Sequence, residues 1–171
     1  LKDTKYLVTE IDESDGTTCN YVPHLGIINN IDFDHCDFYS DMKDLISSFK
    51  KFGSNSEQLL TNYDCKITQE NINSNYKWSI KEKKGINFSM IPKEVNQGYT
   101  IADYYENEKL IKTIKIPVPG LHNLANVTAA ISACRILNIK KENIIENINY
   151  LQLPKKRFEL RGEIYDRKII D

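Results

Sequence analysis

Two apolar runs near the start of the sequence each lead directly into hydrogen-bonding and metal-ligating side chains. The first run is followed by Glu10, Asp12, Glu13 and Asp15, and the second by Asn29, Asn30, Asp32, Asp34 and His35. Grouped carboxylates suit a hard divalent cation such as Mg²⁺, which takes one or two carboxylates and fills its other positions with water and phosphate oxygens. His35 follows Glu10 by 25 residues, so the two can meet if both runs are neighbouring strands. The residues alone leave open the alternative of solvated loops with an Asp-Gly turn and a helix-capping aspartate.

A third polar cluster, in "PGLHNLAN", stands at the start of a predicted helix and contains His122, Asn123 and Asn126. Backbone N–H groups and side-chain amides at a helix start can hold an anion or read the edge of an adenine ring. An Asn N-cap would explain Asn123 but not His122. Further along, "LPKKRFELRG" offers Lys156 and Arg157 as phosphate ligands, and a solvated basic loop is the alternative.

Composition and missing motifs exclude several classes of protein. With 23 Lys and Arg against 24 Asp and Glu, the net charge of −1 favours neither nucleic acid nor a membrane surface as partner. No GxxxxGK[ST] phosphate loop and no GxSxG elbow occurs in the sequence. The four cysteines lack the spacing of a zinc site or a secreted disulfide framework, so we expect reduced thiols in a cytosol. The sequence contains no run of 18 apolar residues and no basic stretch followed by an apolar one, so we expect neither a membrane-spanning helix nor a signal peptide.

The elements that must position these residues follow the pattern of a mainly parallel α/β sheet, in which strands alternate with polar loops and helices. Strands are predicted at Tyr6–Thr9 and Leu25–Asn29, and an amphipathic helix runs from an N-cap at Ser40 to Gly53. A further core strand and a small antiparallel subsheet are predicted at Leu59–Asn62, Trp78–Ile80, Ile86–Ile91, Tyr99–Tyr105 and Leu110–Ile116.

Helical spacing returns in the last third of the chain. One helix is predicted from near Asn123 to Leu137, and a shorter one from Ile144 to Leu151 before Pro154. The tail "GEIYDRKIID" has the character of a strand. A length of 171 residues suits one domain with a core of its own.

Four stretches in this order resemble the Mur ligase superfamily, the ATP-dependent amide-forming ligases of peptidoglycan precursor synthesis: "EIDESDGT", "INNIDFDHCDFY", "VPGLHNLANVTAA" and "KKRFELRGEIYDRKIID". They look most like the members that join L-alanine to UDP-N-acetylmuramate. The resemblance implies that residues 1–171 are the P-loop NTPase-like central domain of a three-domain enzyme of the bacterial cytoplasm. It places the family's phosphate loop upstream of Leu1 and the start of the C-terminal domain at Asp171, so we expect this piece alone to be inactive.

The resemblance also implies roles for individual residues. It assigns magnesium to Glu10 and His35, the surroundings of adenine to His122, Asn123 and Asn126, the nucleotide phosphates to Arg157, the ribose to Asp171, and the substrate to Asn30 and His35. Catalysis would then rest on Glu10, His35 and Arg157. Two positions depart from the family pattern, since Asn29 stands where the family has threonine and Lys156 replaces the first of two arginines.

The reaction implied by the resemblance moves the γ-phosphoryl group of ATP to the lactyl carboxylate of UDP-N-acetylmuramate, and the amine of L-alanine then attacks the acyl phosphate. The expected cofactors are ATP and Mg²⁺. A ligase that recycles the murein tripeptide, or another ligase of this architecture such as folylpolyglutamate synthase, is the alternative enzyme. The alternative outside enzymes is a nucleotide-binding α/β module without catalysis.

Overall fold

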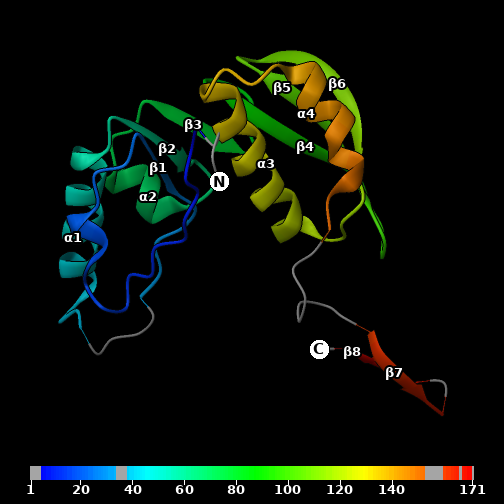
Figure 1. Ribbon diagram of the computed structural model, residues 1–171, viewed down its shortest axis with the longest axis horizontal. Coiled ribbons are helices and arrows are strands. Elements are labelled where there is room, and N and C mark those ends of the chain that lie inside the picture. Colours follow the sequence, from blue (N-terminus) through cyan, green and yellow to red (C-terminus); the bar gives the residue numbers. More distant parts are fainter. Residues whose placement is uncertain (1–4, 34–37, 153–159, 166, 171) are drawn as a thin grey trace. The chain divides into compact units, whose positions relative to one another are not determined.

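The computed structural model describes residues 5–33, 38–152, 160–165 and 167–170, and its chain divides into two units (Figure 1). The first unit is Leu1–Trp78 and the second is Ser79–Asp171. Among the described residues, no helix is both long enough and apolar enough to cross a membrane. The three described cysteines, Cys19, Cys65 and Cys134, are free thiols.

The first unit carries short parallel strands joined through helices. The strands are β1 (Leu25–Ile28), β2 (Gln58–Asn62) and β3 (Tyr76–Ser79), and the helical elements are η1 (Thr18–Asn20), α1 (Met42–Asn55) and α2 (Lys66–Asn71). Gly26 of β1 lies opposite Leu59 of β2, and Leu60 lies opposite Tyr76 of β3, both in parallel register. The predicted strand–helix–strand order is therefore present, and α2 is an additional helix that the sequence pattern did not predict.

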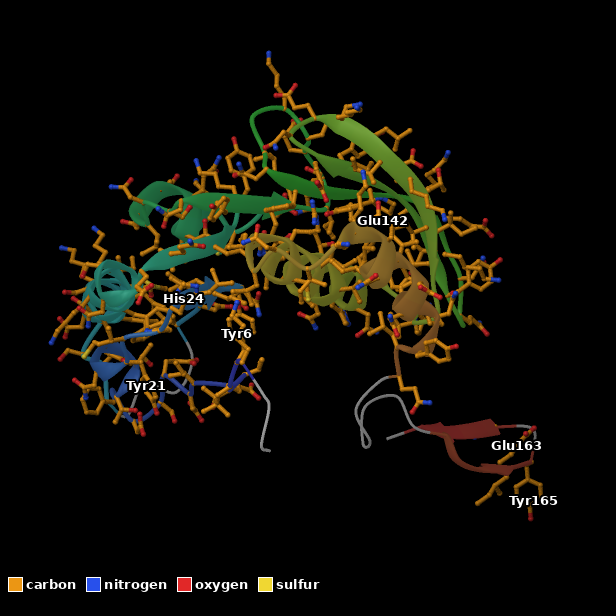
Figure 2. The ribbon with its side chains drawn as sticks, turned by 45° about the horizontal axis from the view of Figure 1, so that its top comes forward. Tyr6, Tyr21, His24, Glu142, Glu163 and Tyr165 are labelled. Carbon is orange, nitrogen blue, oxygen red and sulfur yellow. The ribbon has the colours of Figure 1, made fainter. Side chains whose placement is uncertain are left out.

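The strand predicted at Tyr6–Thr9 is wrong. Residues 6–10 have no regular secondary structure, and the side chains of Leu7 and Val8 are each 91% exposed. The ring of Tyr6, labelled in Figure 2, has the Nζ of the neighbouring Lys5 at 5.2 Å from its centroid. Strand-forming residues need a neighbouring strand to receive their hydrogen bonds and cover their side chains, and no described strand pairs with this segment.

The first long helix begins and ends one or two residues later than predicted. Asp41, not Ser40, is the N-cap of α1, because its carboxylate accepts hydrogen bonds from two backbone N–H groups of the first turn at 2.7 and 3.0 Å. Gly53 lies inside α1, which continues to Asn55. A Cβ on Gly53 would lie 2.9 Å from Cδ2 of Leu59, so this glycine lets α1 approach β2 closely and does not end the helix.

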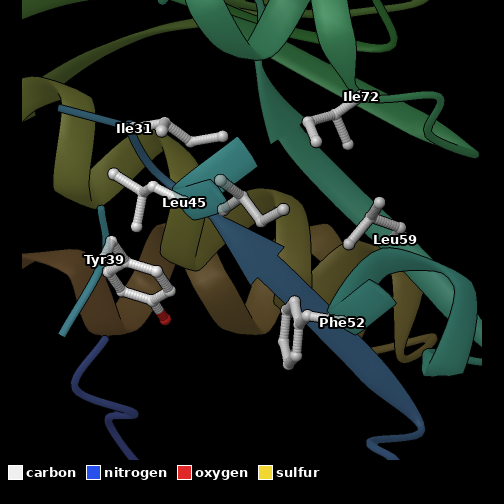
Figure 3. Packing of buried hydrophobic residues seen from close by; sticks show 7 residues of the cluster. Ile31, Tyr39, Leu45, Phe52, Leu59 and Ile72 are labelled. Carbon is white, nitrogen blue, oxygen red and sulfur yellow. The ribbon is translucent and has the colours of Figure 1, made fainter. Parts of the chain in front are cut away.

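A cluster of apolar side chains joins α1 to the sheet of the first unit. Its buried members, shown in Figure 3, are Ile28, Ile31, Tyr39, Leu45, Phe52, Leu59 and Ile72. Full burial of one aliphatic side chain of this size stabilises the fold by about 1.5–3 kcal/mol. Ile31 and Tyr39 belong to this cluster although they lie outside the helices and strands, so the core reaches into the segments that follow β1 and precede α1.

The second unit contains an antiparallel sheet with helices against it (Figure 1). Its elements are β4 (Phe88–Val95), β5 (Thr100–Glu106), β6 (Lys109–Ile116), α3 (Leu121–Ile136), α4 (Lys141–Asn147), η2 (Ile148–Tyr150) and the hairpin of β7 (Leu160–Ile164) and β8 (Arg167–Ile170). Thr100, Ala102 and Tyr104 alternate along β5 as buried residues, and α3 packs against β4. Within the second unit the strands follow the order β4-β5-β6, with both neighbouring pairs antiparallel, and within the first unit the order is β1-β2-β3. The predicted α/β class with an antiparallel subsheet is confirmed.

An ion pair between Glu106 and Arg135 joins the end of β5 to the end of α3. Arg135 donates through Nε to Oε1 of Glu106 at 2.7 Å and through Nη2 to Oε2 at 3.2 Å, while its Nη1 donates to the carbonyl of Ile139 at 2.7 Å. The hydroxyl of Tyr104 donates to the same carboxylate at 2.8 Å. Burial alone would raise the pKa of Glu106, but the hydrogen bonds from Arg135 and Tyr104 outweigh burial and lower it.

Replacing Arg135 with alanine is expected to lower the free energy of unfolding by about 2 kcal/mol at pH 7, because it leaves a half-buried carboxylate without its cation. Since the pKa of Glu106 is lower in the folded state, its contribution is present above the unfolded pKa of about 4.3 and is lost as the pH falls through the folded value. Urea unfolding from pH 7 to pH 3 should therefore show the difference from wild type shrinking on acidification. Lys112→Ala, an exposed change on β6, is the control, and an equal loss in this variant would contradict the assignment.

Candidate functional site

In the acidic loop, residues 10–20, two of the four carboxylates accept hydrogen bonds from the loop's own turns. Oδ1 of Asp12 accepts from the N–H of Ser14 at 2.9 Å. Oδ1 of Asp15 accepts from the N–H and the hydroxyl of Thr17 at 2.9 and 2.7 Å, and these hydrogen bonds lower the pKa of Asp15. The side chain of Glu10 is exposed and makes no hydrogen bond to any described residue. Asp12 and Asp15 thus have the turn role that was the alternative interpretation, and Glu10 remains available as a ligand.

The loop after β1 presents amides at the carboxyl end of the strand. Asn29 and Asn30 are exposed, whereas Ile31 is only 3% exposed and anchors the loop in the core. The carboxylate of Asp32 accepts from the N–H of Phe33 at 2.9 Å, which is a local contact within the loop. Asn30 therefore leaves the sheet at the edge where α/β proteins bind ligands.

One core cluster anchors both loops. Ile11, directly after Glu10, packs against the cluster that contains Ile31, which directly follows Asn30. Glu10 and Asn30 are therefore each one residue away from a side chain held in the same apolar cluster.

The loop after β2 reaches the same edge, and the sequence analysis named no candidate there. Oδ1 of Asn62 accepts from the N–H of Asp64 at 2.8 Å, and the thiol of Cys65 points to the carbonyl of Ile31 at 3.9 Å. This contact joins the loops after two neighbouring parallel strands. The signal in the sequence is the polar stretch "YDC" directly after the strand predicted at Leu59–Asn62, the same kind of signal that identified Asn30.

The start of α3 forms a second polar surface, in the second unit. Gly120, with a φ of 87°, is the N-cap residue, so Asn123 is not the N-cap. Nδ2 of Asn123 donates to the carbonyl of Pro119 at 2.6 Å, which fixes the amide against the residue before the cap. His122 and Asn126 are exposed, make no side-chain hydrogen bond to a described residue, and lie four residues apart on one helix face. The imidazole of His122, the amide of Asn126 and the free backbone N–H groups of the first turn could bind an aromatic base or an anion.

Several sequence candidates lie outside the described residues. They are His35, Arg157 and Asp171, together with Asp34, Cys36, Pro154 and Lys156. Glu10 and Asn30 belong to the first unit, and the three α3 residues belong to the second. The geometry that supports a site therefore consists of one carboxyl edge and one helix start.

The metal-binding groups among the described residues suit Mg²⁺, which needs few protein ligands, better than a metal whose ligands all come from the protein. Among the residues described, no three His, Cys, Asp or Glu side chains gather closely enough to hold an ion. Mg²⁺ takes one or two carboxylates and completes its shell with water and phosphate, so a single exposed Glu10 suits it and would not suit structural zinc.

An apolar cavity of about 310 Å³ between α3, α4 and η2 has a different chemistry from these sites. Its wall is formed mostly by aliphatic residues, including Val127, Ile131 and Ile144, with Asn143 and Asn147 from α4. Because no charged side chain lines it, the cavity does not suit nucleotide phosphates.

Comparison with known sequences gives a family match and close relatives. A model of the Mur ligase middle domain matches residues 1–134. The chain is 58% identical over 171 residues to the UDP-N-acetylmuramate–L-alanine ligase of Prochlorococcus marinus subsp. pastoris, covering all of this chain and 36% of that protein. A ligase of the same name from Prochlorococcus marinus strain NATL1A is 44% identical over 168 residues, covering 98% and 34%. The chain spans about a third of the length of the curated relatives it matches.

Solved structures share the fold. The crystal structure of UDP-N-acetylmuramate-alanine ligase MurC from Thermotoga maritima aligns with a TM-score of 0.79 at 21% identity, covering 94% of this chain and 37% of that one. The MurF ligase from the same organism, solved in complex with ADP, aligns with a TM-score of 0.61 at 17% identity, covering 82% and 33%. At these identities the likeness concerns the fold.

Proposed function

Because this chain belongs to the Mur ligase family, we propose that it is the ATP-binding middle domain of a ligase that joins L-alanine to UDP-N-acetylmuramate. The observation that carries the proposal is the 58% identity, over all 171 residues, to a ligase with that name. The proposal places the domain at residues 1–171, the phosphate loop upstream of Leu1, and the C-terminal domain from Asp171. The enzyme would work in the bacterial cytoplasm on UDP-N-acetylmuramate and L-alanine, with neither nucleic acid nor a membrane as partner.

The proposed adenine site lies at the start of α3. His122, Asn123 and Asn126 would surround the adenine ring, and the amide of Asn123, held by Pro119, presents its oxygen in a fixed orientation. ADP bound to the MurF ligase of Thermotoga maritima supports a nucleotide site in this fold. Arg157 at the phosphates and Asp171 at the ribose are proposed from the family pattern, since both lie outside the described residues.

The proposed chemistry forms an acyl phosphate from the lactyl carboxylate and the γ-phosphoryl group of ATP, and the amine of L-alanine then displaces phosphate. When bound, Mg²⁺ would neutralise negative charge between the carboxylate and the phosphates. Glu10 and His35 would hold it, and Arg157 would add positive charge from the nucleotide side. Asn30 and His35 would orient the carboxylate. The work of these residues is positioning and charge neutralisation, so none of them needs to act as an acid or a base.

Substrate identity is tested by phosphate release from the full-length enzyme with ATP and UDP-N-acetylmuramate. We expect release to require L-alanine. A requirement for the murein tripeptide would favour the recycling ligase, and a requirement for glutamate with a folate would favour folylpolyglutamate synthase. Nucleotide binding without phosphate release under any of these conditions would favour a binding module without catalysis.

A further inference from the structure

The ring of Phe38 lies directly on the turn of the acidic loop. Gly16, at this turn, has a φ of 70°, and a Cβ built on it would lie 2.6 Å from Cδ1 of Phe38 and closer still to Cε1 and Cζ. A side chain at position 16 would therefore overlap the ring. Phe38 is nevertheless 59% exposed, so its ring packs on Gly16 without being buried in the core.

The ring of Phe38 packs against Tyr39, a residue of the core cluster. It makes an edge-to-face contact with Tyr39, with ring centroids 5.2 Å apart and an interplanar angle of 77°. Tyr39 is only 6% exposed, belongs to the core cluster, and donates from its hydroxyl to Oγ of Ser48 on α1 at 3.2 Å. A continuous series of contacts thus leads from Gly16 through two rings to α1.

Contacts near both ends of the acidic loop hold it against the described part of the first unit, where η1 packs against α1. Ile11 packs on the core cluster at its start, and Nδ2 of Asn55 donates to the carbonyl of Cys19 at 2.9 Å near its end. Between these two anchors, the hydrogen bonds of the Asp15 carboxylate go to Thr17 of the same loop. Before Glu10, the side chains of Leu7 and Val8 are each 91% exposed. The contact of Phe38 with Gly16 lies between these two anchors and holds the middle of the loop.

We propose that Phe38 is a positioning residue for the metal-binding carboxylate. By packing on Gly16, its ring holds the acidic loop against the first unit and so keeps Glu10 where Mg²⁺ binding requires it. Phe38 itself contacts neither metal nor substrate. This inference rests on the magnesium role of Glu10 in the proposed function.

The test uses the full-length enzyme with Phe38→Ala and two reference variants. Phe38→Tyr keeps the ring, and Tyr21→Ala removes a 43% exposed ring just beyond the loop, one with no described ring contact (Figure 2). Hydrogen–deuterium exchange of residues 10–20, without ATP or metal, should become about fivefold faster in Phe38→Ala only. The Mg²⁺ concentration for half-maximal activity should rise about fivefold in the same variant, with a smaller change in kcat.

Each outcome decides the proposal. Unchanged exchange in Phe38→Ala overturns it, as does faster exchange with an unchanged Mg²⁺ requirement. A purely structural role would lower thermal stability without moving the Mg²⁺ requirement. Glu10→Gln, measured in parallel, reports on the proposed function separately. Wild-type behaviour of Glu10→Gln would remove the metal role itself, whereas a defect in Glu10→Gln with a normal Phe38→Ala would remove only the present inference.

Discussion

In the full-length enzyme, Glu10→Ala is expected to lower kcat by at least about 100-fold, and His35→Ala should do the same. Glu10 supplies a free, exposed carboxylate beside a core-anchored residue, and a hard cation between two negatively charged reactants needs such a ligand. Steady-state rates at saturating ATP, with Mg²⁺ varied, measure the effect. Raised Mg²⁺ should restore part of the activity of Glu10→Ala, because a weakened site can still be filled.

The matched control for this experiment is Glu13→Ala. Glu13 lies in the same loop, and its described contact runs through its backbone carbonyl, which accepts from the N–H of Gly16 at 3.0 Å. Loss of the Glu13 carboxylate should leave kcat within about threefold of wild type. Equal losses in both variants would show that the negative charge of the loop, and not a specific ligand, matters. Wild-type turnover in Glu10→Ala would refute the metal role.

The second large effect is expected at the start of α3. Replacing both His122 and Asn126 with alanine should raise the KM for ATP by about 100-fold, since two exposed groups on one helix face would no longer contact the base. The kcat at saturating ATP should change far less, because the adenine ring lies far from the transferred phosphoryl group. Initial rates over a wide range of ATP concentrations separate the two parameters.

Asn143→Ala is the control for this pair. It removes an exposed amide from α4, at the apolar cavity that does not suit phosphates, and should leave the KM for ATP unchanged. A KM for ATP that stays at the wild-type value in the His122 and Asn126 double variant would contradict the proposed adenine site. A fall in kcat with unchanged KM would instead move these residues toward the chemistry.

Helices and strands could be predicted from the sequence where the spacing of apolar residues matches the face that each element buries. Thr100, Ala102 and Tyr104 alternate in the strand that was expected there, and α1 presents Leu45 and Phe52 to the core. The failures came from tertiary context. Leu7 and Val8 have strand-forming side chains but no described strand to pair with, and Gly53 serves close packing against Leu59 inside a helix.

The site could be predicted in part, because polar residues after strands mark the ligand edge of a parallel sheet. That rule identified Asn30, which follows the end of β1, but it does not account for Glu10, because the strand predicted at Tyr6–Thr9 is absent. Spacing in the sequence does not show that Asp12 and Asp15 serve turns, because that depends on hydrogen bonds to Ser14 and Thr17. The packing of Phe38 on Gly16 joins positions distant in the sequence and leaves no periodic signal.

The most direct test of the account is the fate of the carboxylate oxygen of UDP-N-acetylmuramate. With both carboxylate oxygens labelled with ¹⁸O, the full-length enzyme should release phosphate carrying one labelled oxygen for each L-alanine joined, because an acyl phosphate transfers that oxygen when the amine displaces phosphate. Mass spectrometry of the phosphate measures the label. Phosphate without ¹⁸O, released at the same rate as the amide forms, would contradict the proposed reaction.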